Sequence, residues 1–393
     1  MYKLPNINIV NSNYMIADQL DIINEVRAFT DTEIRPFAKE FEENEAIPND
    51  LIKKMAQMGY LGACFPKEYG GLGLNSIAYG QFTEEVGKAC SSVRAILTVH
   101  SSLVGETILR WGTQEQKSTI IPAMASGKKI AAFALTEPEV GTDAKSVRTT
   151  HKKEGNSYII NGKKKWITLG NIADLFIVIS SCEGKITAFL IDRETEGVST
   201  KPIKGLLAGR AAHIAEIEFN NVKVPRENIL GKEDNGFSYI VNTALDFGRY
   251  SIAWGGLAIA QESLECMVSY SRNRKQFGKG LHTFQLIQGM IGDAVTKVRA
   301  ARALCLNAGK LRTEKSEDAI METTIAKYYT SVIANEIAKD AVQVHGGNGC
   351  YNEYPVERLF REAKILEIIE GTSQIQQEII ANFGFRRYYL RRD

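Results

Sequence analysis

Apolar residues recur at helical spacing through the first third of the chain and again through the last third. A spacing of three to four residues between apolar positions is typical of an amphipathic helix with one buried face. The first such pattern predicts helices over residues 14–128. Its first members are Ile16, Leu20, Ile23 and Val26. In the last third, the long amphipathic segments lie at about 237–272, 281–312 and 317–345. Three long helices with short connections predict a bundle.

Between these helical parts, from Lys129 onward, the pattern changes to short runs rich in β-branched and aromatic residues. Turn-forming pairs such as Asn161-Gly162 and Asn220-Asn221 separate the runs, which is typical of an antiparallel sheet. The runs are Ile130–Leu135, Tyr158–Asn161, Lys165–Thr168, Leu175–Ser180, Thr187–Asp192 and Ala215–Val224.

The order of these elements predicts an α+β protein with three consecutive domains. The N-terminal domain (residues 1–128) is α-helical, the middle domain (129–236) is an antiparallel β domain, and the C-terminal domain (237–393) is a four-helix-bundle-like helical domain. A chain of 393 residues is long enough to give each part a core.

Composition narrows the function classes. The 48 basic and 46 acidic residues nearly cancel, so the charge does not favour nucleic acid or an anionic membrane as a partner. The four arginines near the C-terminus are interpreted as a solvated end: Arg386, Arg387, Arg391 and Arg392. No apolar run approaches the roughly 20 residues of a membrane helix, and the N-terminus carries no secretory or transit pattern.

The six cysteines are scattered along the chain, and no two of them form a Cys-x-x-Cys pair. This spacing argues against a disulfide framework and against a metal site. We therefore expect a cytoplasmic protein with free thiols and no bound metal.

The segment around Glu370 places one carboxylate between apolar residues and a glycine. An apolar pocket raises the pKa of a carboxyl group and makes it a better proton acceptor near neutral pH. Gly371 lets a ligand approach the backbone closely, and Thr372 can cap the helix that follows. A plain junction between two helices explains the same residues, so the segment alone leaves both interpretations open.

Two segments of the β domain carry groups suited to a planar ligand. The first leaves a strand for a turn rich in hydroxyls and backbone donors, and its candidates are Leu135, Thr136, Gly141 and Thr142. The second places Trp166 and Thr168 on a strand. An ordinary strand exit and a tryptophan packed in the core are the alternatives.

Two segments of the last third carry groups suited to a dinucleotide. The guanidinium of Arg274, near Phe277 and Gln285, suits a pyrophosphate. Gln343 precedes Gly346 and Gly347, where a ligand's adenylate end could approach the backbone. Solvated charges and a helix C-cap are the alternatives. No Gly-x-Gly-x-x-Gly follows a strand, which disfavours a Rossmann nicotinamide enzyme.

Taken in order, these segments resemble the flavin-dependent acyl-CoA dehydrogenase family over nearly all of the chain. The resemblance implies that family's fold, FAD as the cofactor, and Glu370 as the base that removes the α-proton of an acyl thioester while the β-hydride goes to flavin N5. The positions matched to FAD contacts are Leu135, Thr136, Gly141, Thr142, Trp166, Thr168, Arg274, Phe277, Gln285, Gln343, Gly346, Gly347, Thr372 and Gln374. In the family, the segments around Arg274 and Gln343 reach the FAD of a neighbouring subunit, so the resemblance implies a homo-oligomer, either a dimer or a tetramer.

The resemblance also matches residues on the substrate side. Asp246 and Arg249 correspond to a pair near the channel for the thioester carrier, although a surface ion pair at i, i+3 is the plain alternative. Some relatives carry the catalytic Glu beside this Arg, where the chain has Gly248, and this leaves Glu370 as the base. Gly371 follows the base and completes this set.

Arg94 is a lone charge in a segment of mostly apolar or small residues, Ser91–Leu103. The segment is similar to one in glutaryl-CoA dehydrogenases, whose arginine meets the substrate's distal carboxylate. A surface charge at a helix end is the alternative. Ile369, where most relatives have Tyr, changes one wall near the thioester.

The runs Ala244–Ser251 and Gln343–Cys350 resemble those of biosynthetic relatives that act on acyl groups tethered to a carrier protein in polyketide extender-unit pathways. We therefore expect a short, polar or acidic acyl group on CoA or on an acyl carrier protein, with electron-transfer flavoprotein or oxygen as the acceptor. A glutaryl-CoA-type or general short-chain dehydrogenase of catabolism, an acyl thioester oxidase and a non-catalytic flavin-binding relative are the alternatives.

Overall fold

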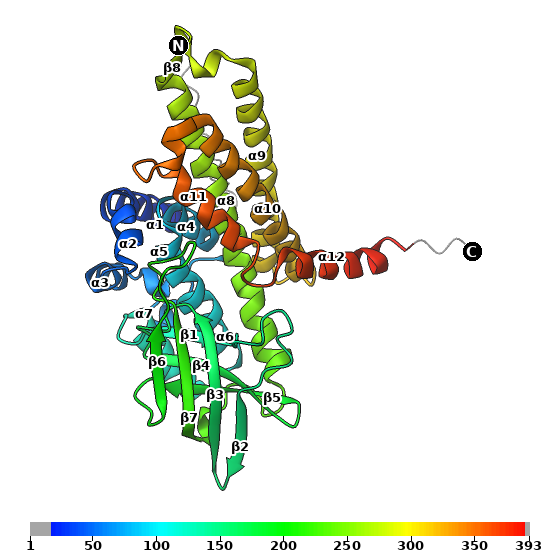
Figure 1. Cartoon of the computed structure of the whole chain (residues 1–393). Helices are drawn as coiled ribbons and strands as arrows, with labels where there is room; N and C mark the ends of the chain where they lie inside the picture. Colours follow the sequence, from blue (N-terminus) through cyan, green and yellow to red (C-terminus); the bar gives the residue numbers. More distant parts are fainter. Residues whose placement is uncertain (1–16, 390–393) are drawn as a thin grey trace.

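The computed structural model describes residues 17–389, so Ile16, Arg391 and Arg392 lie outside the described residues. Helices come first along the chain, then one β-sheet, then a group of long helices (Figure 1). This is the predicted order, and the α+β fold class is confirmed.

The N-terminal part is helical, as predicted. Its helices are α1 (Ala17–Phe29), α2 (Ala38–Asn44), α3 (Asn49–Gln57), α4 (Ser76–Ala89), α5 (Ser91–Ile96), α6 (Glu106–Trp111) and α7 (Gln114–Ala125). Polar side chains cap two of them: Asn75 Oδ1 accepts a hydrogen bond from the N–H of Ala78 at 3.0 Å, and Thr113 forms a capping box with Gln116. A π-helical stretch, Leu97–Gly105, joins α5 to α6 and is buried throughout. A helix buried on all sides lies in the core.

The middle part is a seven-stranded sheet. Its strands are β1 (Ala131–Ala134), β2 (Thr150–Glu154), β3 (Ser157–Ile167), β4 (Leu175–Cys182), β5 (Lys185–Asp192), β6 (Val198–Pro202) and β7 (Ala215–Pro225). They lie in the order β1-β4-β2-β3-β7-β6, with β5 beside β4. The expectation of an antiparallel sheet holds for most neighbours, but β2 runs parallel to β4, with Thr150 opposite Ser181. Strands β1 and β4 also run parallel, with Ala131 opposite Leu175. The β2–β3 hairpin lies between these two strands in sequence and gives the chain the length that a parallel return needs.

Two predicted turns are wrong. Asn161-Gly162 and Asn220-Asn221 lie inside β3 and β7, which pair past them with a register shift between Ile160 and Gly162. The side chains satisfy the backbone at this bulge, since Asn161 Oδ1 accepts a hydrogen bond from the N–H of Asn221 at 2.8 Å. The two runs predicted on either side of Gly162 are therefore halves of one strand.

Strands β2 and β6 were not predicted. Both are short, polar and largely exposed, so neither carries the apolar alternation from which a strand is recognised.

The C-terminal part contains the three predicted long helices and two shorter ones. They are α8 (Asn242–Asn273), α9 (Gln285–Thr313), α10 (Ala319–His345), α11 (Val356–Leu366) and α12 (Ser373–Arg387). A small hairpin, β8 (Lys275–Gln276) and β9 (Lys279–Gly280), joins α8 to α9. Helix α8 is buried over most of its length and packs against α4, α9 and α10. Arg386 and Arg387 are exposed in the last turn of α12, which projects away from the other helices (Figure 1).

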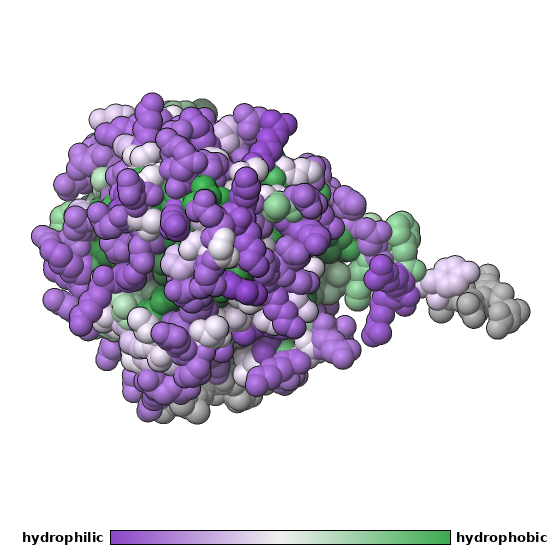
Figure 2. Space-filling view, turned by 90° about the horizontal axis from the view of Figure 1, so that it is seen from below, coloured by the Kyte–Doolittle hydropathy of each residue, from purple (hydrophilic) through white to green (hydrophobic). Residues whose placement is uncertain are grey.

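The surface seen from below is mainly hydrophilic, with scattered apolar patches (Figure 2). All six cysteines are free. Among residues 17–389, no helix combines the length and apolar character needed to cross a lipid bilayer.

Candidate active site

Glu370 lies in the connection between α11 and α12. Its backbone has φ = 56° and that of Gly371 has φ = 92°, two consecutive left-handed residues. The carboxylate atom Oε2 is buried and has no hydrogen-bond partner among the described residues. Burial raises the pKa of Glu370 to about 7, although Arg249, Lys327 and Arg94 lower it. The plain helix junction is therefore a poor description of this segment, because its carboxylate faces inward.

Gly248 of α8 provides the space for this carboxylate. A Cβ atom at Gly248 would lie 2.5 Å from Glu370 Oε2 and 2.8 Å from Leu103 Cδ1. Any side chain at this position would therefore displace the carboxylate or the leucine. Gly248, which stands where some relatives carry their catalytic Glu, thus leaves room for the carboxylate of Glu370.

Asp246 and Arg249 form no ion pair with each other among the described residues, so the alternative of a surface ion pair is wrong. Asp246 is 8% exposed and accepts a hydrogen bond from Arg312 Nη1 at 2.9 Å. Arg249 instead donates from Nε to the carbonyl oxygen of Glu370 at 3.1 Å. Of the two, Arg249 is the residue that contacts the Glu370 segment.

Arg94 is 2% exposed, so the surface charge considered from the sequence is also wrong. Its Nη1 donates to Thr98 Oγ1 at 2.8 Å, while its Nε has no partner among the described residues. Two glycines flank the side chain: a Cβ at Gly87 would lie 2.8 Å from Arg94 Cδ, and one at Gly255 would lie 2.7 Å from Arg94 Cζ. Burial lowers the pKa of Arg94 to about 10, which still leaves it a cation at neutral pH. Arg94 is thus a buried cation near Glu370, and its Nε donor is unpaired among the described residues.

Trp166 and Thr168 lie where β3 leaves the sheet. Trp166 has φ = 61° and is 51% exposed, so the alternative of a tryptophan packed in the core is wrong. A large ring held outward by a left-handed backbone suits contact with a flat partner. The exposed Trp166 ring therefore fits an isoalloxazine.

The loop that leaves β1 is tied to β3 beneath Trp166. Lys164 is fully buried, and its Nζ donates to the carbonyl oxygen of Leu135 at 3.0 Å and to Glu137 Oε1 at 2.7 Å. The N–H of Lys165 donates to the carbonyl oxygen of Thr136 at 2.8 Å. These bonds place Thr136 beside the strand that carries Trp166. Gly141 and Thr142 lie exposed farther along the same loop.

A second set of predicted residues lies at the other end of the helical part. Arg274 and Phe277 belong to the segment of the β8–β9 hairpin, at the top of Figure 1, whereas β1 and β3 lie near the bottom. Phe277 is 92% exposed. Arg274, His345 and Asn348 line one hollow of about 440 Å³. Gln285, Gln343, Gly346 and Gly347 are exposed as well. The structure therefore does not bring this set to Glu370 within one chain.

The two FAD positions matched beyond Glu370 lie at the start of α12. Thr372 caps this helix, its Oγ1 accepting from the N–H of Ile375 at 3.3 Å, and Gln374 is exposed in the first turn. Both are therefore adjacent in sequence and space to the catalytic candidate.

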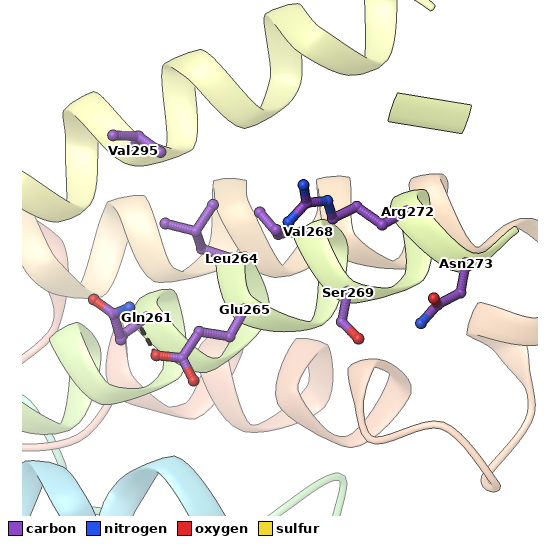
Figure 3. A pocket seen from close by; sticks show the side chains of 8 residues that line it. All are labelled: Gln261, Leu264, Glu265, Val268, Ser269, Arg272, Asn273 and Val295. Carbon is purple, nitrogen blue, oxygen red and sulfur yellow. Dashed lines mark hydrogen bonds between the residues drawn. The ribbon is translucent and has the colours of Figure 1, made fainter. Parts of the chain in front are cut away.

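Another hollow, of about 520 Å³, lies between α8 and α9 (Figure 3). Leu264 and Val268 of α8 and Val295 of α9 form its apolar part, and Arg272 marks its end. None of the residues matched to FAD or to the substrate lines it, so the hollow is separate from the candidate site.

Sequence reasoning missed Lys327 of α10 and Gln376 of α12. Both are fully buried, and both donate to carbonyl oxygens of the Glu370–Gly371 segment. One available signal was the Lys itself, which follows Ile325 and Ala326 in an apolar stretch of α10. A lysine at a core-facing helical position needs a buried acceptor.

Comparison with known proteins covers all three parts of the fold. The N-terminal, middle and C-terminal domain models of acyl-CoA dehydrogenase match residues 17–128, 132–222 and 234–384. A 3-(aryl)acrylate reductase of Clostridium sporogenes is 38% identical, with coverage of 93% of this chain and 98% of the relative. A short-chain specific acyl-CoA dehydrogenase of Clostridium acetobutylicum is also 38% identical, with coverage of 92% and 96%. The subunit CarC of a caffeyl-CoA reductase–Etf complex from Acetobacterium woodii is 37% identical, with coverage of 88% and 93%.

Solved structures agree over nearly the whole chain. Butyryl-CoA dehydrogenase of Megasphaera elsdenii superposes with a TM-score of 0.90 at 34% identity, covering 94% of this chain and 98% of that one. Glutaryl-CoA dehydrogenase of Mycobacterium smegmatis in complex with FADH2 gives 0.91 at 29% identity, covering 97% and 98%. The prolyl acyl carrier protein oxidase AnaB gives 0.88 at 28% identity, covering 94% and 99%. This chain belongs to the acyl-CoA dehydrogenase family, and it is an FAD-dependent oxidoreductase that acts on CH–CH groups.

Proposed function

We propose that the enzyme dehydrogenates a short acyl thioester between its α- and β-carbons, with Glu370 as the base that takes the α-proton. The observation that carries the proposal is the buried Oε2 of Glu370, which has no partner among the described residues. A carboxylate with one free oxygen and a pKa of about 7 can take up a proton near neutral pH.

The segment around the base also supports activation of the thioester. A thioester carbonyl acidifies the α-carbon only modestly, so its oxygen needs preorganised donors. The N–H of Glu370 donates to no other described residue, which leaves it available for this oxygen. The cations of Arg249 and Lys327 lower the pKa of Glu370 and so keep part of it ionised and ready.

The residues near β1 and β3 support the cofactor's place. Trp166 would lie against the ring system, and Thr136 and Thr168 would offer hydroxyls to its polar edge. Bound FAD supplies the acceptor for the hydride that leaves the β-carbon, and the electron pair of the broken α-C–H bond becomes the new C=C bond.

Arg94 supports a short acyl group with a polar or acidic end. A buried guanidinium attracts a carboxylate, and the free Nε of Arg94 can donate a hydrogen bond to it. A long alkyl chain would leave this buried donor unpaired. The likeness to a short-chain specific enzyme and to glutaryl-CoA dehydrogenase supports this size range. The likeness to a carrier protein oxidase keeps an acyl carrier protein as a second candidate carrier beside CoA.

The position of Arg274 and Phe277 supports assembly with a second copy. These residues belong to the segment of the β8–β9 hairpin, which lies far from β3, the strand of Trp166 (Figure 1). We infer that one chain does not hold both ends of the cofactor. We take a homodimer, or a tetramer built from such dimers, as the functional form. The Etf-linked relative supports an electron-transfer flavoprotein as the acceptor.

A panel of thioesters tests the proposal. Butyryl, glutaryl, methylmalonyl and palmitoyl groups are offered on CoA and on an acyl carrier protein, and the flavin absorbance band is followed under anaerobic conditions. We expect the band to fade fastest with a short polar or acidic group. Faster fading with palmitoyl thioester would contradict the proposed substrate, and no fading with any thioester would contradict the proposed reaction.

Arg94→Gln tests the substrate class separately. Loss of the buried cation is expected to raise KM for an acidic thioester at least about tenfold, as removal of a charged hydrogen-bond partner does, and to change KM for butyryl thioester much less. Equal changes for both substrates would assign Arg94 to packing alone.

Reduction of an enoyl thioester is a second candidate direction, since two of the relatives are named reductases. The same residues serve it, with Glu370 protonating the α-carbon. Initial rates measured with an acyl thioester plus acceptor and with an enoyl thioester plus donor decide which direction the enzyme favours.

A further inference from the structure

The backbone of Glu370 and Gly371 is held by three side chains from three helices. Arg249 Nε donates to the carbonyl oxygen of Glu370 at 3.1 Å, and Lys327 Nζ donates to that of Gly371 at 2.8 Å. Gln376 Nε2 donates to both oxygens, each at 3.1 Å. Two consecutive carbonyl groups thus accept four hydrogen bonds.

This arrangement maintains an unfavourable backbone. Glu370 has φ = 56°, a left-handed backbone conformation that residues with a Cβ rarely adopt. Gly371, with φ = 92°, also needs its missing side chain, because a Cβ there would lie 2.7 Å from Gln376 Nε2. Strained residues persist where the surrounding contacts over-determine them, and here the contacts are the hydrogen bonds to the two carbonyls.

Among the described residues, the side chains of Lys327 and Gln376 donate hydrogen bonds only to the carbonyl oxygens of Glu370 and Gly371. Lys327 and Gln376 are each 0% exposed, and Gln376 Oε1 has no partner among the described residues. Removing a lysine ammonium and an amide from water is unfavourable unless strong acceptors receive them. Their acceptors are the two carbonyls next to the carboxylate.

The held carbonyls decide which way the neighbouring N–H groups point. In a trans peptide the N–H lies opposite the C=O, so the N–H groups of Gly371 and Thr372 turn away from the three side chains. Neither they nor the N–H of Glu370 donate to another described backbone group. A row of free donors therefore borders the catalytic carboxylate.

We propose that Lys327 and Gln376 are positioning residues that, together with Arg249, lock the Glu370–Gly371 backbone so that the carboxylate and the free N–H groups face the acyl thioester at the same time. The proposal rests on Glu370 being the base. Lys327 also contributes charge, whereas Gln376 contributes only hydrogen bonds, and this difference makes the two roles separable.

The charged groups that face Glu370 are Arg249 of α8, Lys327 of α10 and Arg94 of α5. Each favours the ionised carboxylate and so lowers its pKa. Removal of Lys327 alone must therefore raise the kinetic pKa of the base. Removal of Gln376 leaves all three cations in place.

The experiment compares Lys327→Met and Gln376→Leu with the wild-type holoenzyme. Lys339→Met serves as the control, since Lys339 is an exposed lysine of the same helix. Flavin content, circular dichroism and the single-turnover rate of flavin reduction by a short acyl thioester are measured from pH 5.5 to 9. Glu370→Gln is measured in parallel.

We expect both variants to bind FAD and to lose roughly 10- to 100-fold in the limiting rate, in the range that misplacement of a catalytic group produces. The midpoint of the pH profile should move up for Lys327→Met and stay in place for Gln376→Leu, while Lys339→Met matches the wild type. Lys327→Arg, which keeps the charge and a donor, should recover part of the rate and the original midpoint.

Wild-type rates in both variants, with Glu370→Gln inactive, would overturn the positioning role and leave the base intact. Full activity of Glu370→Gln would overturn the proposed function itself. Should Lys327→Met fail to fold, the Lys327→Arg and Gln376→Leu measurements still decide, because an unchanged rate in Gln376→Leu contradicts the proposal.

Discussion

At the scale of single residues, the site depends on a carboxylate kept in an unfavourable place. The pKa of Glu370, raised by burial to about 7 in the folded protein, lies above the value of about 4.3 for an unfolded chain. Folding therefore favours the protonated form, and this contribution to stability is lost as the pH rises from about 4.3 through 7. Above pH 7 the protein folds around an ionised, incompletely paired carboxylate.

Glu370→Gln should consequently reduce activity and increase stability. We expect the rate of flavin reduction to fall by about 10²–10⁴, as general-base loss does, with FAD still bound. The free energy of unfolding at pH 8 should rise by roughly 1–3 kcal/mol, and the gain should shrink toward pH 5. Urea unfolding at the two pH values measures this difference. A variant less stable than the wild type at pH 8 would show that Glu370 is better paired than its buried Oε2 indicates.

Gly248 offers a second test at this scale. Gly248→Ala replaces a glycine inside α8 and, on helix propensity alone, should stabilise the helix by about 0.5–1 kcal/mol. Its Cβ would nevertheless overlap the Glu370 carboxylate, so we expect the reduction rate to fall at least about tenfold. Gly289→Ala in α9 is the matched control, because a Cβ at Gly289 meets nothing within 4 Å. An unchanged rate in Gly248→Ala would mean that the carboxylate does not occupy this position during turnover.

At the scale of elements, the β1 loop and strand β3, the two segments expected to face the cofactor, are held by one buried ion pair, Lys164–Glu137. Glu137 accepts hydrogen bonds from the N–H groups of Arg148 (2.6 Å) and Thr149 (2.9 Å) as well as from Lys164. Burial raises the pKa of Glu137, but the charge and hydrogen bonds of these partners outweigh it and hold the pKa below its usual value. The pair therefore connects the β1 loop, the start of β2 and β3.

Lys164→Met should loosen both loops. Breaking a buried pair by removing one partner costs about 3–5 kcal/mol, so we expect a lower urea midpoint and loss of FAD during gel filtration. The double variant Lys164→Met, Glu137→Gln leaves no uncompensated charge and should recover part of the stability. Full FAD retention in the single variant would separate this ion pair from the cofactor site.

The elements also show how far the sequence could predict this fold. The long helices carry a periodicity that survives to their ends, and their predicted bounds lie within a few residues of α8, α9 and α10. The break predicted at Asn161-Gly162 failed because a glycine and two asparagines can serve a bulge as well as a turn, and only the partner strand decides between them.

The candidate site, too, was only partly predictable from the sequence. Glu370 was predicted as the base because its segment resembles the catalytic-base segment of the acyl-CoA dehydrogenase family, since the local residues alone leave both interpretations open. Lys327 and Gln376 were missed because their acceptors are backbone carbonyls of residues 370 and 371, and backbone acceptors leave no sequence signal. The pairing of Asp246 with Arg312, 66 positions away, is likewise a product of α8 packing against α9.

At the scale of the whole molecule, the residues expected to bind FAD lie at two ends of one chain. Arg274→Ala, which alters only the distal end, should weaken FAD retention without changing Glu370 or the fold. Flavin content after gel filtration measures the loss, and Arg272→Ala, an exposed arginine beside it, is the control. An FAD content equal to that of the wild type would remove Arg274 from the cofactor site.

Mixed assemblies test whether the two ends come from different subunits. Each site in a C2 dimer would combine Glu370 of one protomer with Arg274 of the other. In a mixed dimer of Glu370→Gln and Arg274→Ala chains, one site carries both changes and the other carries neither. Random assembly of equal amounts makes about half of the dimers mixed, so about a quarter of all sites should be intact. Co-refolding the two variants, with loosely held FAD then removed by gel filtration, should therefore give roughly a quarter of wild-type activity above the residual activity of either variant alone. If one chain supplied both ends, every site would keep one change, and mixing would restore nothing.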